Sequence, residues 1–560
     1  MKKRYILLLF CFVCSLSLSV FGQEKPDLGT IHGSLQSDAQ YTFVDSTIGA
    51  EARPEKILSN SYLQLLYQRG KIEVGTRFEI YQTPLLGFDP RYTGLGIANK
   101  YARYRGDFLD ITVGNFYEQF GNGSILRAYQ EWALGIDNSI EGLRVKVKPT
   151  KGVVFTALVG KQRAFWEKSK GIVRAGDMDI NLNAAIPAWE KWKSRYSFGA
   201  SVVSVYQADD NPSLKLPQNV AAFSGRAAFT RSAIHFEAEG AYKANDPDAT
   251  NKFVYNTGNQ LYAQGSYSKK GFAISAAVKR VDNMNFRSDR NANFNSQTLS
   301  FLPPITKTHT YRLPTLYPYA TQPNGEFGGQ VNVYYRIKKG TKAGGKYGWQ
   351  FAVNYARVNG LDTTHLYSKI TDTTGSYKYL YKSSFWGDSN KFYFQDFNIE
   401  ISKKWSDKFK QTLTYVYLTY NKDVVQKGSD IVEFGTIHSH NIILESSYEF
   451  DDKNALRTEL QHMYVEKKNG HQDFGNWAML MAEYSVSPHW YFTAFDEYNY
   501  GNSEKAKRVH YVSTQISYIK DSHRIAIGYG RQREGLLCVG GICRAVPASN
   551  GFTISFSSTF

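Results

Sequence analysis

The sequence predicts an all-β protein, a single large transmembrane antiparallel up-and-down β-barrel of about 24 strands, within a range of about 22 to 26. Alternating apolar and polar segments of about 9 to 12 residues recur from one end of the chain to the other. Short and long connections follow one another in turn, as in barrels with short periplasmic turns and long extracellular loops. The 560 residues include 40 Tyr, 35 Phe and 9 Trp, which favour strands and form the aromatic girdles of such barrels.

Composition excludes two other classes of protein. Beyond its N-terminal segment the chain has no run of about 20 apolar residues, so a bundle of membrane-spanning helices is excluded. The aromatic content is the opposite of that of disordered chains. Because no linker or shift in composition divides the chain, we expect one barrel domain over residues 23–560, behind a signal peptide at residues 1–22.

The N-terminus predicts export. Basic residues at positions 2–4 precede an apolar run at 6–13, and a short cleavage motif leads up to Gln23. A lipid anchor on Cys14 is disfavoured because the bulky Val13 stands where a small residue is expected. Behind such a signal, a barrel is expected in the cell outer membrane of a Gram-negative bacterium.

The two cysteines outside the signal peptide, Cys538 and Cys543, flank the pair Gly540-Gly541. A Gly-Gly pair forms a two-residue hairpin turn with positive φ, which places the cysteines directly opposite each other. In an oxidising compartment this geometry predicts a disulfide. The alternative is a reduced dithiol or one half of a soft-metal site.

The segment 71–80 illustrates the strand pattern, with apolar side chains on one face and charged ones on the other. The apolar face carries Ile72, Val74, Phe78 and Ile80, and the charged face carries Glu73, Arg77 and Glu79. A half-solvated sheet of a soluble sandwich gives the same alternation. Its repetition in so many segments behind a signal peptide favours lipid outside and water inside.

The last ten residues, 551–560, form the most specific feature. Phe552, Ile554 and Phe556 alternate with small polar residues, and the chain ends on Phe560. The pattern looks like the insertion signal of outer-membrane barrels, whose last strand is read by the barrel assembly machinery. Phe556 and Phe560 are therefore expected to act as the assembly signal.

The longest connections are expected at the extracellular side, at residues 85–98, 120–138, 283–324 and 359–388. The aromatic stretch 283–324 is interpreted either as a surface docking loop or as an inward plug. The connection 187–193, on the periplasmic side, carries two Trp and is interpreted as an interfacial anchor or a partner contact.

A Gly-rich stretch, 114–124, carries the densest group of charges that suggests a function. We interpret it as a segment that folds into the lumen and narrows it, where a field between carboxylates and guanidinium groups selects solutes by charge. The candidate constriction residues are Arg77, Glu79, Glu118, Arg127, Glu131 and Asp137. The alternative is a structural loop whose ions pair with neighbouring strands.

The sequence resembles an uncharacterised, porin-like family of Bacteroidota outer-membrane β-barrels. The resemblance is carried by the Gly-rich stretch 114–124, by Gly540-Gly541-Ile542-Cys543-Arg544 and by the terminal strand. The resemblance extends over the whole mature chain. It implies the fold and the location, and it implies no settled activity.

The sequence offers little support for catalysis. It contains no nucleophile elbow, zinc-protease helix or nucleotide-binding loop. His438 and His440 lie on one face of a strand without a third metal ligand and are interpreted as lumen or loop residues. We therefore expect no enzyme activity, no metal and no cofactor.

The formal net charge of +17 is spread through turns and loops without a nucleic-acid recognition motif. Outer-membrane lipid and lipopolysaccharide are therefore the expected partners, together with the barrel assembly machinery during insertion. Other proteins of an outer-membrane complex are possible further partners.

The leading hypothesis is a porin-like channel for small hydrophilic solutes, with inward loops setting the size cutoff. The second is a non-conducting barrel that scaffolds a secretion, barrel-assembly or surface-lipoprotein complex, and a barrel enzyme is third. A TonB-dependent transporter is disfavoured because the first strand is expected within a few residues of Gln23, without a separate plug domain before it.

Overall fold

The computed structural model describes residues 28–293, 296–366, 381–426, 433–466, 475–539 and 542–560. The predicted signal peptide and the turn at Gly540-Gly541 lie outside these residues.

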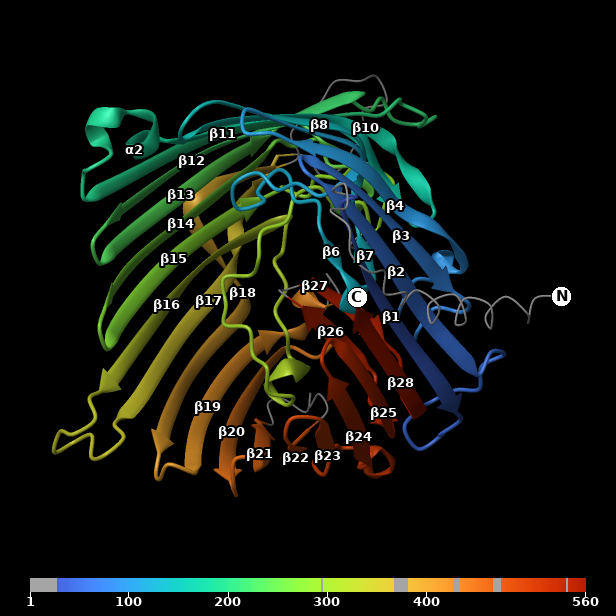
Figure 1. Ribbon diagram of the computed structural model, residues 1–560, viewed down its shortest axis with the longest axis vertical. Helices are drawn as coiled ribbons and strands as arrows, with labels where there is room; N and C mark the ends of the chain where they lie inside the picture. Colours follow the sequence, from blue (N-terminus) through green and yellow to red (C-terminus); the bar gives the residue numbers. More distant parts are fainter. Residues whose placement is uncertain (1–27, 294–295, 367–380, 427–432, 467–474, 540–541) are drawn as a thin grey trace.

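The described chain forms a closed antiparallel barrel of 24 strands, which confirms the predicted fold (Figure 1). Successive strands pair along the chain, and β28 pairs with β1 to close the wall. The barrel strands are β1 (Thr30–Phe43), β2 (Ile57–Arg69), β3 (Ile72–Tyr81), β4 (Gly94–Arg105), β5 (Leu109–Phe116), β8 (Ile140–Thr150), β9 (Val153–Ala164), β10 (Glu167–Asn181), β11 (Ser194–Tyr206), β12 (Asn219–Arg231), β13 (Ile234–Lys243), β14 (Gly258–Lys269), β15 (Phe272–Asp282), β16 (Gly325–Ile337), β17 (Trp349–His365), β18 (Tyr381–Lys404), β19 (Phe409–Asn421), β20 (Thr436–Glu449), β21 (Asn454–Val465), β22 (Trp477–Val486), β23 (Trp490–Tyr498), β24 (His510–Lys520), β25 (His523–Gln532) and β28 (Ser549–Thr559).

Two small hairpins and several single helical turns lie outside the barrel sheet. The hairpins are β6 (Gln130–Glu131) with β7 (Ile136–Asp137), and β26 (Gly535–Val539) with β27 (Ile542–Val546). The helical turns are η1 (Pro90–Tyr92), η2 (Trp132–Leu134), α2 (Leu182–Ala185), η3 (Pro187–Trp189), η4 (Ala249–Asn251), η5 (Pro314–Leu316), α3 (Lys422–Val425) and η6 (Lys505–Lys507). Within the described ranges, no helix has the length and apolar character needed to cross a membrane.

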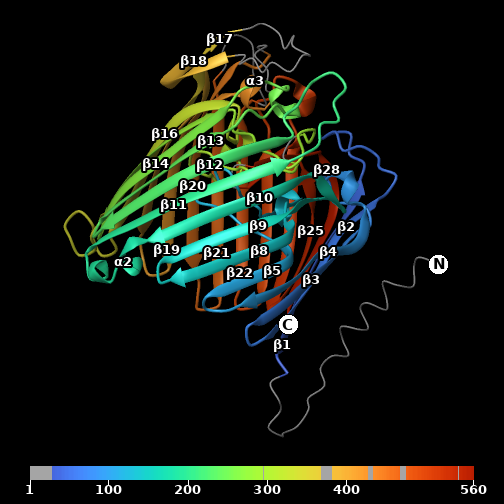
Figure 2. The ribbon, with the colours of Figure 1, turned by 90° about the horizontal axis from the view of Figure 1, so that it is seen from above.

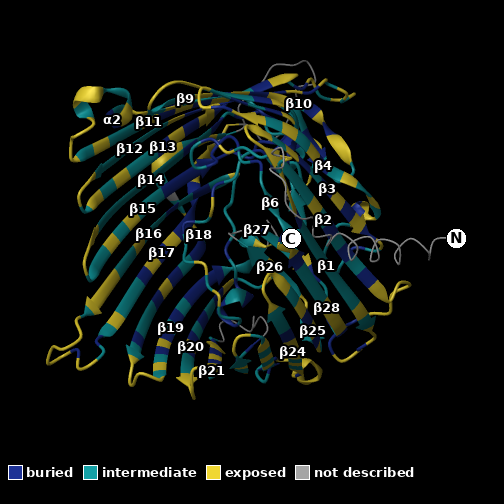
Figure 3. Cartoon of the chain, viewed as in Figure 1, coloured by how far each residue is buried: buried dark blue, intermediate teal, exposed yellow. Residues whose placement is uncertain are grey.

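The wall has an apolar outer face and a polar inner face, as β3 shows. Val74 and Ile80 are 43% and 38% exposed on the outside, whereas Arg77 and Glu79 point inward and are only 3% and 1% exposed. Figure 3 shows the same alternation as bands along many strands. The predicted alternation of an apolar outer face and a polar inner face along the strand is therefore confirmed.

Short turns gather at one end of the barrel and long connections at the other (Figure 2). Gly70 and Gly271 adopt positive φ (55° and 86°) in two short turns, a conformation that favours glycine. We call these the short-turn end and the long-loop end.

The prediction of a loop over residues 359–388 is wrong in part. β17 continues to His365 and β18 begins at Tyr381, so the two strands extend as a hairpin beyond their neighbours. Their pairing shifts register between Val358 and Thr363, and these irregularities break the period-2 pattern by which a strand is recognised in sequence. The prediction for 85–98 is also too long, because β4 begins at Gly94.

Two of the long connections turn into the barrel at the long-loop end (Figure 1). We call residues 117–139 the first inward segment and residues 283–324 the second inward segment. Phe120 and Leu126 of the first and Phe286 and Leu299 of the second are buried together against inward side chains of the wall. The chain itself therefore occupies part of the lumen in its long-loop half.

Candidate functional site

The first inward segment leaves the wall where β5 ends at Phe116. Gly121 and Gly123 have positive φ (51° and 91°) and let the chain turn sharply into the lumen. The chain then forms the small hairpin β6–β7 around η2, which ends at the left-handed Gly135. This hairpin brings Asp137 back toward the wall.

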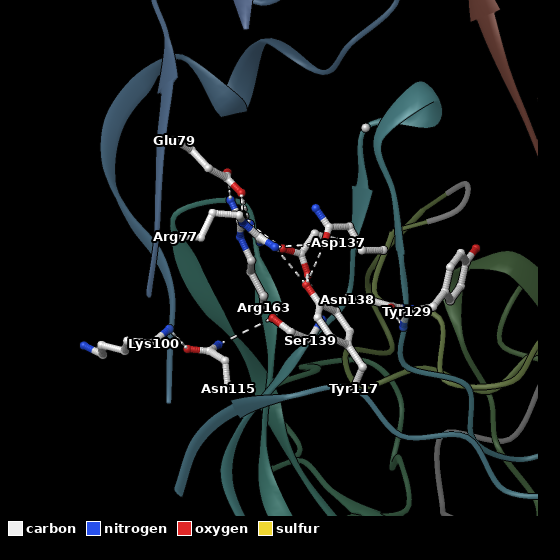
Figure 4. A network of polar contacts seen from close by, with 12 residues as sticks. Arg77, Glu79, Lys100, Asn115, Tyr117, Tyr129, Asp137, Asn138, Ser139 and Arg163 are labelled. Carbon is white, nitrogen blue, oxygen red and sulfur yellow. Dashed lines mark hydrogen bonds and ion pairs between the residues drawn. The ribbon is translucent and has the colours of Figure 1, made fainter. Parts of the chain in front are cut away.

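Asp137 meets three charged side chains of the wall in a buried cluster (Figure 4). Arg163 of β9 contacts Asp137 at 2.6 Å and Glu79 at 2.7 Å. Arg77 of β3 contacts Glu79 at 2.8 Å and also pairs with Asp137. All four side chains are at most 7% exposed, so two cations and two anions form a neutral group away from water.

Further hydrogen bonds complete the cluster. Tyr117 donates its hydroxyl to Asp137 at 3.0 Å, and Arg77 donates to the side-chain oxygen of Gln130 at 2.9 Å. The backbone N–H of Ser139 donates to the same Asp137 carboxylate at 3.1 Å. Burial raises the pKa of Asp137, but Arg77, Arg163 and Ser139 outweigh it and hold that pKa below its ordinary value.

An aromatic cluster covers the ions on the long-loop side. Its members are Tyr62, Tyr81, Tyr92, Trp132, Phe165 and Trp166. The Trp132 ring lies edge-on to Tyr62 with centroids 3.8 Å apart, and the Arg77 guanidinium lies 5.4 Å from the Trp132 ring. This aromatic cover excludes water, and the low polarity around the ions strengthens their attraction.

Of the six candidate constriction residues, the structure brings Arg77, Glu79 and Asp137 together. Glu118 pairs instead with Arg144 at 3.2 Å and Lys146 at 2.8 Å.

The other two candidates lie apart from the cluster. Arg127 lies between the rings of Tyr129 and Phe301, 4.7 Å from each, and burial lowers its pKa. Glu131 accepts the N–H of Ala133 at 3.2 Å and caps η2.

Two members of the cluster were not predicted, Arg163 and Tyr117. Tyr117 stands inside the Gly-rich stretch, but the sequence does not show that it points at Asp137. Arg163 lies at the end of β9, directly before the aromatic pair Phe165-Trp166. A cation directly before two aromatic residues at the end of a strand is the one local signal that could have marked it.

The second inward segment is anchored mainly by apolar packing. Leu313, Leu316 and Tyr317 are at most 4% exposed and pack against Val416 and Leu418 of β19. The same cluster includes inward apolar side chains of β17, β18, β20, β21 and β22. The long loop 283–324 is therefore an inward plug, one of the two interpretations offered by the sequence.

Ion pairs align the second segment along the wall. Lys307 lies 3.7 Å from Glu400, His309 lies 2.7 Å from Asp396, and Arg312 pairs with Glu497. At the base of the segment, Tyr319 donates to Glu326 at 2.6 Å. The basic residues of the segment thus face acidic residues of β18 and β23.

The hairpin β26–β27 lies over the first inward segment. Cys538 and Cys543 are opposite each other in the hairpin, and the predicted disulfide is present. Arg544 donates to the carbonyl oxygen of Leu86 at 2.8 Å and lies 4.2 Å from the Phe88 ring. Burial lowers the pKa of Arg544 to about 10. The hairpin also contacts η2, so it covers the ion cluster from the long-loop end.

Nearer the short-turn end, the inner wall carries charged side chains that water can reach. Arg103, Lys146 and Arg457 are 23%, 25% and 36% exposed. They pair with Asp110, Glu118 and Glu445. The lumen thus changes from a packed half to a hydrated half along its axis.

The terminal strand completes the wall. Phe552 and Ile554 are 47% and 46% exposed on the outer face of β28, and Phe560 is 51% exposed. The backbone of Phe560 exchanges hydrogen bonds with Gly33 of β1 at 2.7 and 2.9 Å. Phe556 pairs with Ser37 of β1, so both proposed assembly residues lie at the seam that closes the barrel.

The interpretation of His438 and His440 as lumen or loop residues is wrong. Their neighbours Ser439 and Asn441 are fully buried inside, so the two imidazoles lie on the outer face of β20. His440 lies 2.8 Å from the hydroxyl of Tyr415 and 3.0 Å from Glu466. Among the residues that the structure covers, no group of three or more His, Cys, Asp or Glu has the arrangement of a metal site.

Comparisons with solved structures found outer-membrane barrels. The siderophore receptor PirA from Pseudomonas aeruginosa matches at 10% identity and a TM-score of 0.38, over 96% of this chain and 81% of that one. OpdL from the same organism matches at 8% identity and a TM-score of 0.31, over 96% and 99% of the two chains. Wzi from Escherichia coli, a carbohydrate-binding barrel in group 1 capsule assembly, matches at 10% identity and a TM-score of 0.30, over 79% and 81%. The likeness is one of fold alone.

The comparison with curated proteins found no match. A family comparison matched residues 1–560, the whole chain, to a family of unknown function. The chain therefore belongs to the DUF6029 family.

Proposed function

We propose that the protein is a porin-like channel of the outer membrane for small hydrophilic solutes, and that its two inward segments set the size cutoff. In this proposal the short-turn end faces the periplasm and the long-loop end faces the exterior. The signal peptide at residues 1–22 directs export, and the barrel assembly machinery reads the last strand.

The observation that carries the proposal is the fixed position of the first inward segment beside a hydrated, charged wall. Two arginines of the wall, Arg77 and Arg163, hold Asp137 in place, so the segment narrows the lumen at a fixed position. Below it, partly exposed ions such as Lys146 and Arg457 supply the polar surface that hydrophilic solutes need.

A second candidate function is a non-conducting barrel that scaffolds an outer-membrane complex. The observation in its favour is the apolar packing of the second inward segment, where Leu313 and Tyr317 are each 1% exposed inside the barrel. Such packing excludes water from part of the lumen. The two candidates differ in one measurable property, the conductance of the native barrel.

The test is single-channel recording of the purified protein in planar bilayers. Thr321 donates its hydroxyl to the carbonyl oxygen of Leu302 at 2.8 Å, so residues 303–320 can be replaced by a short Gly-Ser linker between neighbouring ends. As a matched control, the turn residues 340–346, outside the lumen, are replaced by the same linker.

We expect stable steps from the native protein, larger steps from the 303–320 variant, and native steps from the control. A silent native protein with a conducting 303–320 variant favours the scaffold. Equal conductance in native protein and variant contradicts the idea that this segment sets the cutoff.

A further inference from the structure

The outer face of the barrel carries a groove across β3, β4, β5 and β8. It has a volume of about 640 Å³ and is lined by Val74, Gly75, Thr76, Lys100, Tyr101, Ala102, Val113, Gly114, Glu141, Gly142 and Lys168. Val74 and Val113 are 43% and 57% exposed, which places the groove on the side that faces lipid.

A row of small residues across the strands brings the backbones together here. Gly114 of β5 is opposite Gly142 of β8, which is opposite Gly160 of β9. A Cβ on Gly114 would lie 2.2 Å from the carbonyl oxygen of Lys100, and one on Gly142 would lie 2.0 Å from that of Val159. Larger residues would therefore push these strands apart, and the groove depends on this close approach.

The groove combines apolar walls with cations. Lys100 is exposed, and Figure 4 shows its side chain pointing away from the buried ion cluster. Lys168 pairs with Glu141 at 3.0 Å and remains 53% exposed. Lys161 is opposite Glu141 in register and shares its outer face. One carboxylate thus stands among three cations, which leaves a positive surplus.

Cations on the lipid-facing side of a barrel are costly near the middle of the bilayer and are tolerated at the headgroup level. Glu141 and Lys168 are the second residues of β8 and β10, both at the long-loop end. Their level is therefore that of the outer-leaflet headgroups, where an anion can balance the surplus charge.

We propose that this groove binds a phosphorylated, acylated lipid of the outer leaflet, the lipid A class of lipopolysaccharide. Its phosphate lies between Lys100 and Lys168, and an acyl chain lies along Val74, Ala102 and Val113. Charge complementarity selects this occupant, because a second copy of the chain docking by the same face would bring like cations together. The inference does not depend on whether the barrel conducts.

The test measures lipid retained by the detergent-purified protein in native mass spectrometry, after addition of diphosphorylated lipid A. The double variant Lys100→Gln and Lys168→Gln removes both cations. The matched control, Lys346→Gln with Lys404→Gln, removes two exposed cations at the short-turn end. Ala102→Trp fills the apolar groove and leaves every charge in place.

We expect the double variant to bind lipid A about tenfold to thirtyfold more weakly, because each cation near an anionic headgroup contributes about threefold to fivefold to the affinity. Ala102→Trp should also lose the lipid, whereas the control should bind it as the native protein does. Native-like binding by the double variant or by Ala102→Trp overturns the proposal, as does equal loss in the control. Glucosamine 1-phosphate has no acyl chain. If the native protein binds it as tightly as lipid A, the groove is a phosphate site and the lipid assignment is overturned.

Discussion

The two inward segments occupy the same half of the lumen but are held there by different forces. The two share an apolar contact at Phe120 and Phe286, but the first is fixed at Asp137 by a neutral group of four buried ions, and the second is held mainly by apolar side chains around Leu313. Buried ions are specific in geometry and fail when one partner is removed, whereas apolar packing loses energy in proportion to the volume removed. The comparison therefore predicts different responses to mutation and to pH.

The inner face of the wall explains the difference. Beside the first segment, the inward residues of β3 and β9 are the charged Arg77, Glu79 and Arg163. Beside the second, most of the inward residues of β19 to β22 near the long-loop end are apolar, including Val416 and Met463. Each segment carries the side chains that match the wall it meets.

The largest effect is expected from Arg163→Ala. The change leaves Glu79 and Asp137 with one guanidinium between them in a buried site, which costs about 3 to 5 kcal/mol of stability. The measurement is thermal unfolding, together with protease cleavage within residues 117–139. The control is Arg91→Ala, which removes an exposed arginine paired with Asp89 and should change little. Equal effects of the two substitutions would contradict the special role of the buried cluster.

Leu313→Ala is expected to cost slightly less, about 2 to 5 kcal/mol, because it leaves a cavity in the apolar cluster. The loss should appear as cleavage within the second inward segment, while the first stays protected. Leu95→Ala, on the outer face where Leu95 is 77% exposed, is the matched control. Cleavage of both segments in the Leu313 variant would show that they unfold as one unit.

The pH response should separate the segments further. The pKa of Asp137 is lower in the folded protein than in the unfolded chain, so its ionised form stabilises the fold. This stabilisation is complete above the unfolded-state pKa of about 4 and is lost as the pH falls through the lower folded-state pKa. In unfolding experiments from pH 7 down to about pH 3, the difference between native protein and Asp137→Asn should therefore narrow only below about pH 4. The difference between native protein and Leu313→Ala should stay constant. A narrowing already at pH 6 would show that another group controls the cluster.

The features that the sequence predicted are those that depend on local alternation. Strand number and the outward position of residues such as Val74 follow from the period of two, because successive side chains of every barrel strand alternate between the outer and the inner face. Whether a loop turns inward depends on wall residues that are distant in the sequence, and no local pattern contains that information. Leu313, for example, packs in the same apolar cluster as Val416 of β19. Arg163 was missed for the same reason. His438 was placed on the wrong face because both faces of β20 carry polar residues here, with Ser439 and Asn441 inside.

The smallest effect is expected from the double variant Cys538→Ser and Cys543→Ser. The disulfide closes a loop of only a few residues, so its loss costs about 2 kcal/mol and acts on the hairpin β26–β27 alone. Faster hydrogen exchange is expected within residues 535–546 and at η2 beneath them, with no change at Leu313. The single variant Leu537→Ser, on an exposed side chain of the same hairpin, is the control. Exchange that accelerates throughout the second inward segment would mean that the hairpin holds both segments, and the division between an ionic and an apolar anchor would then have to be given up.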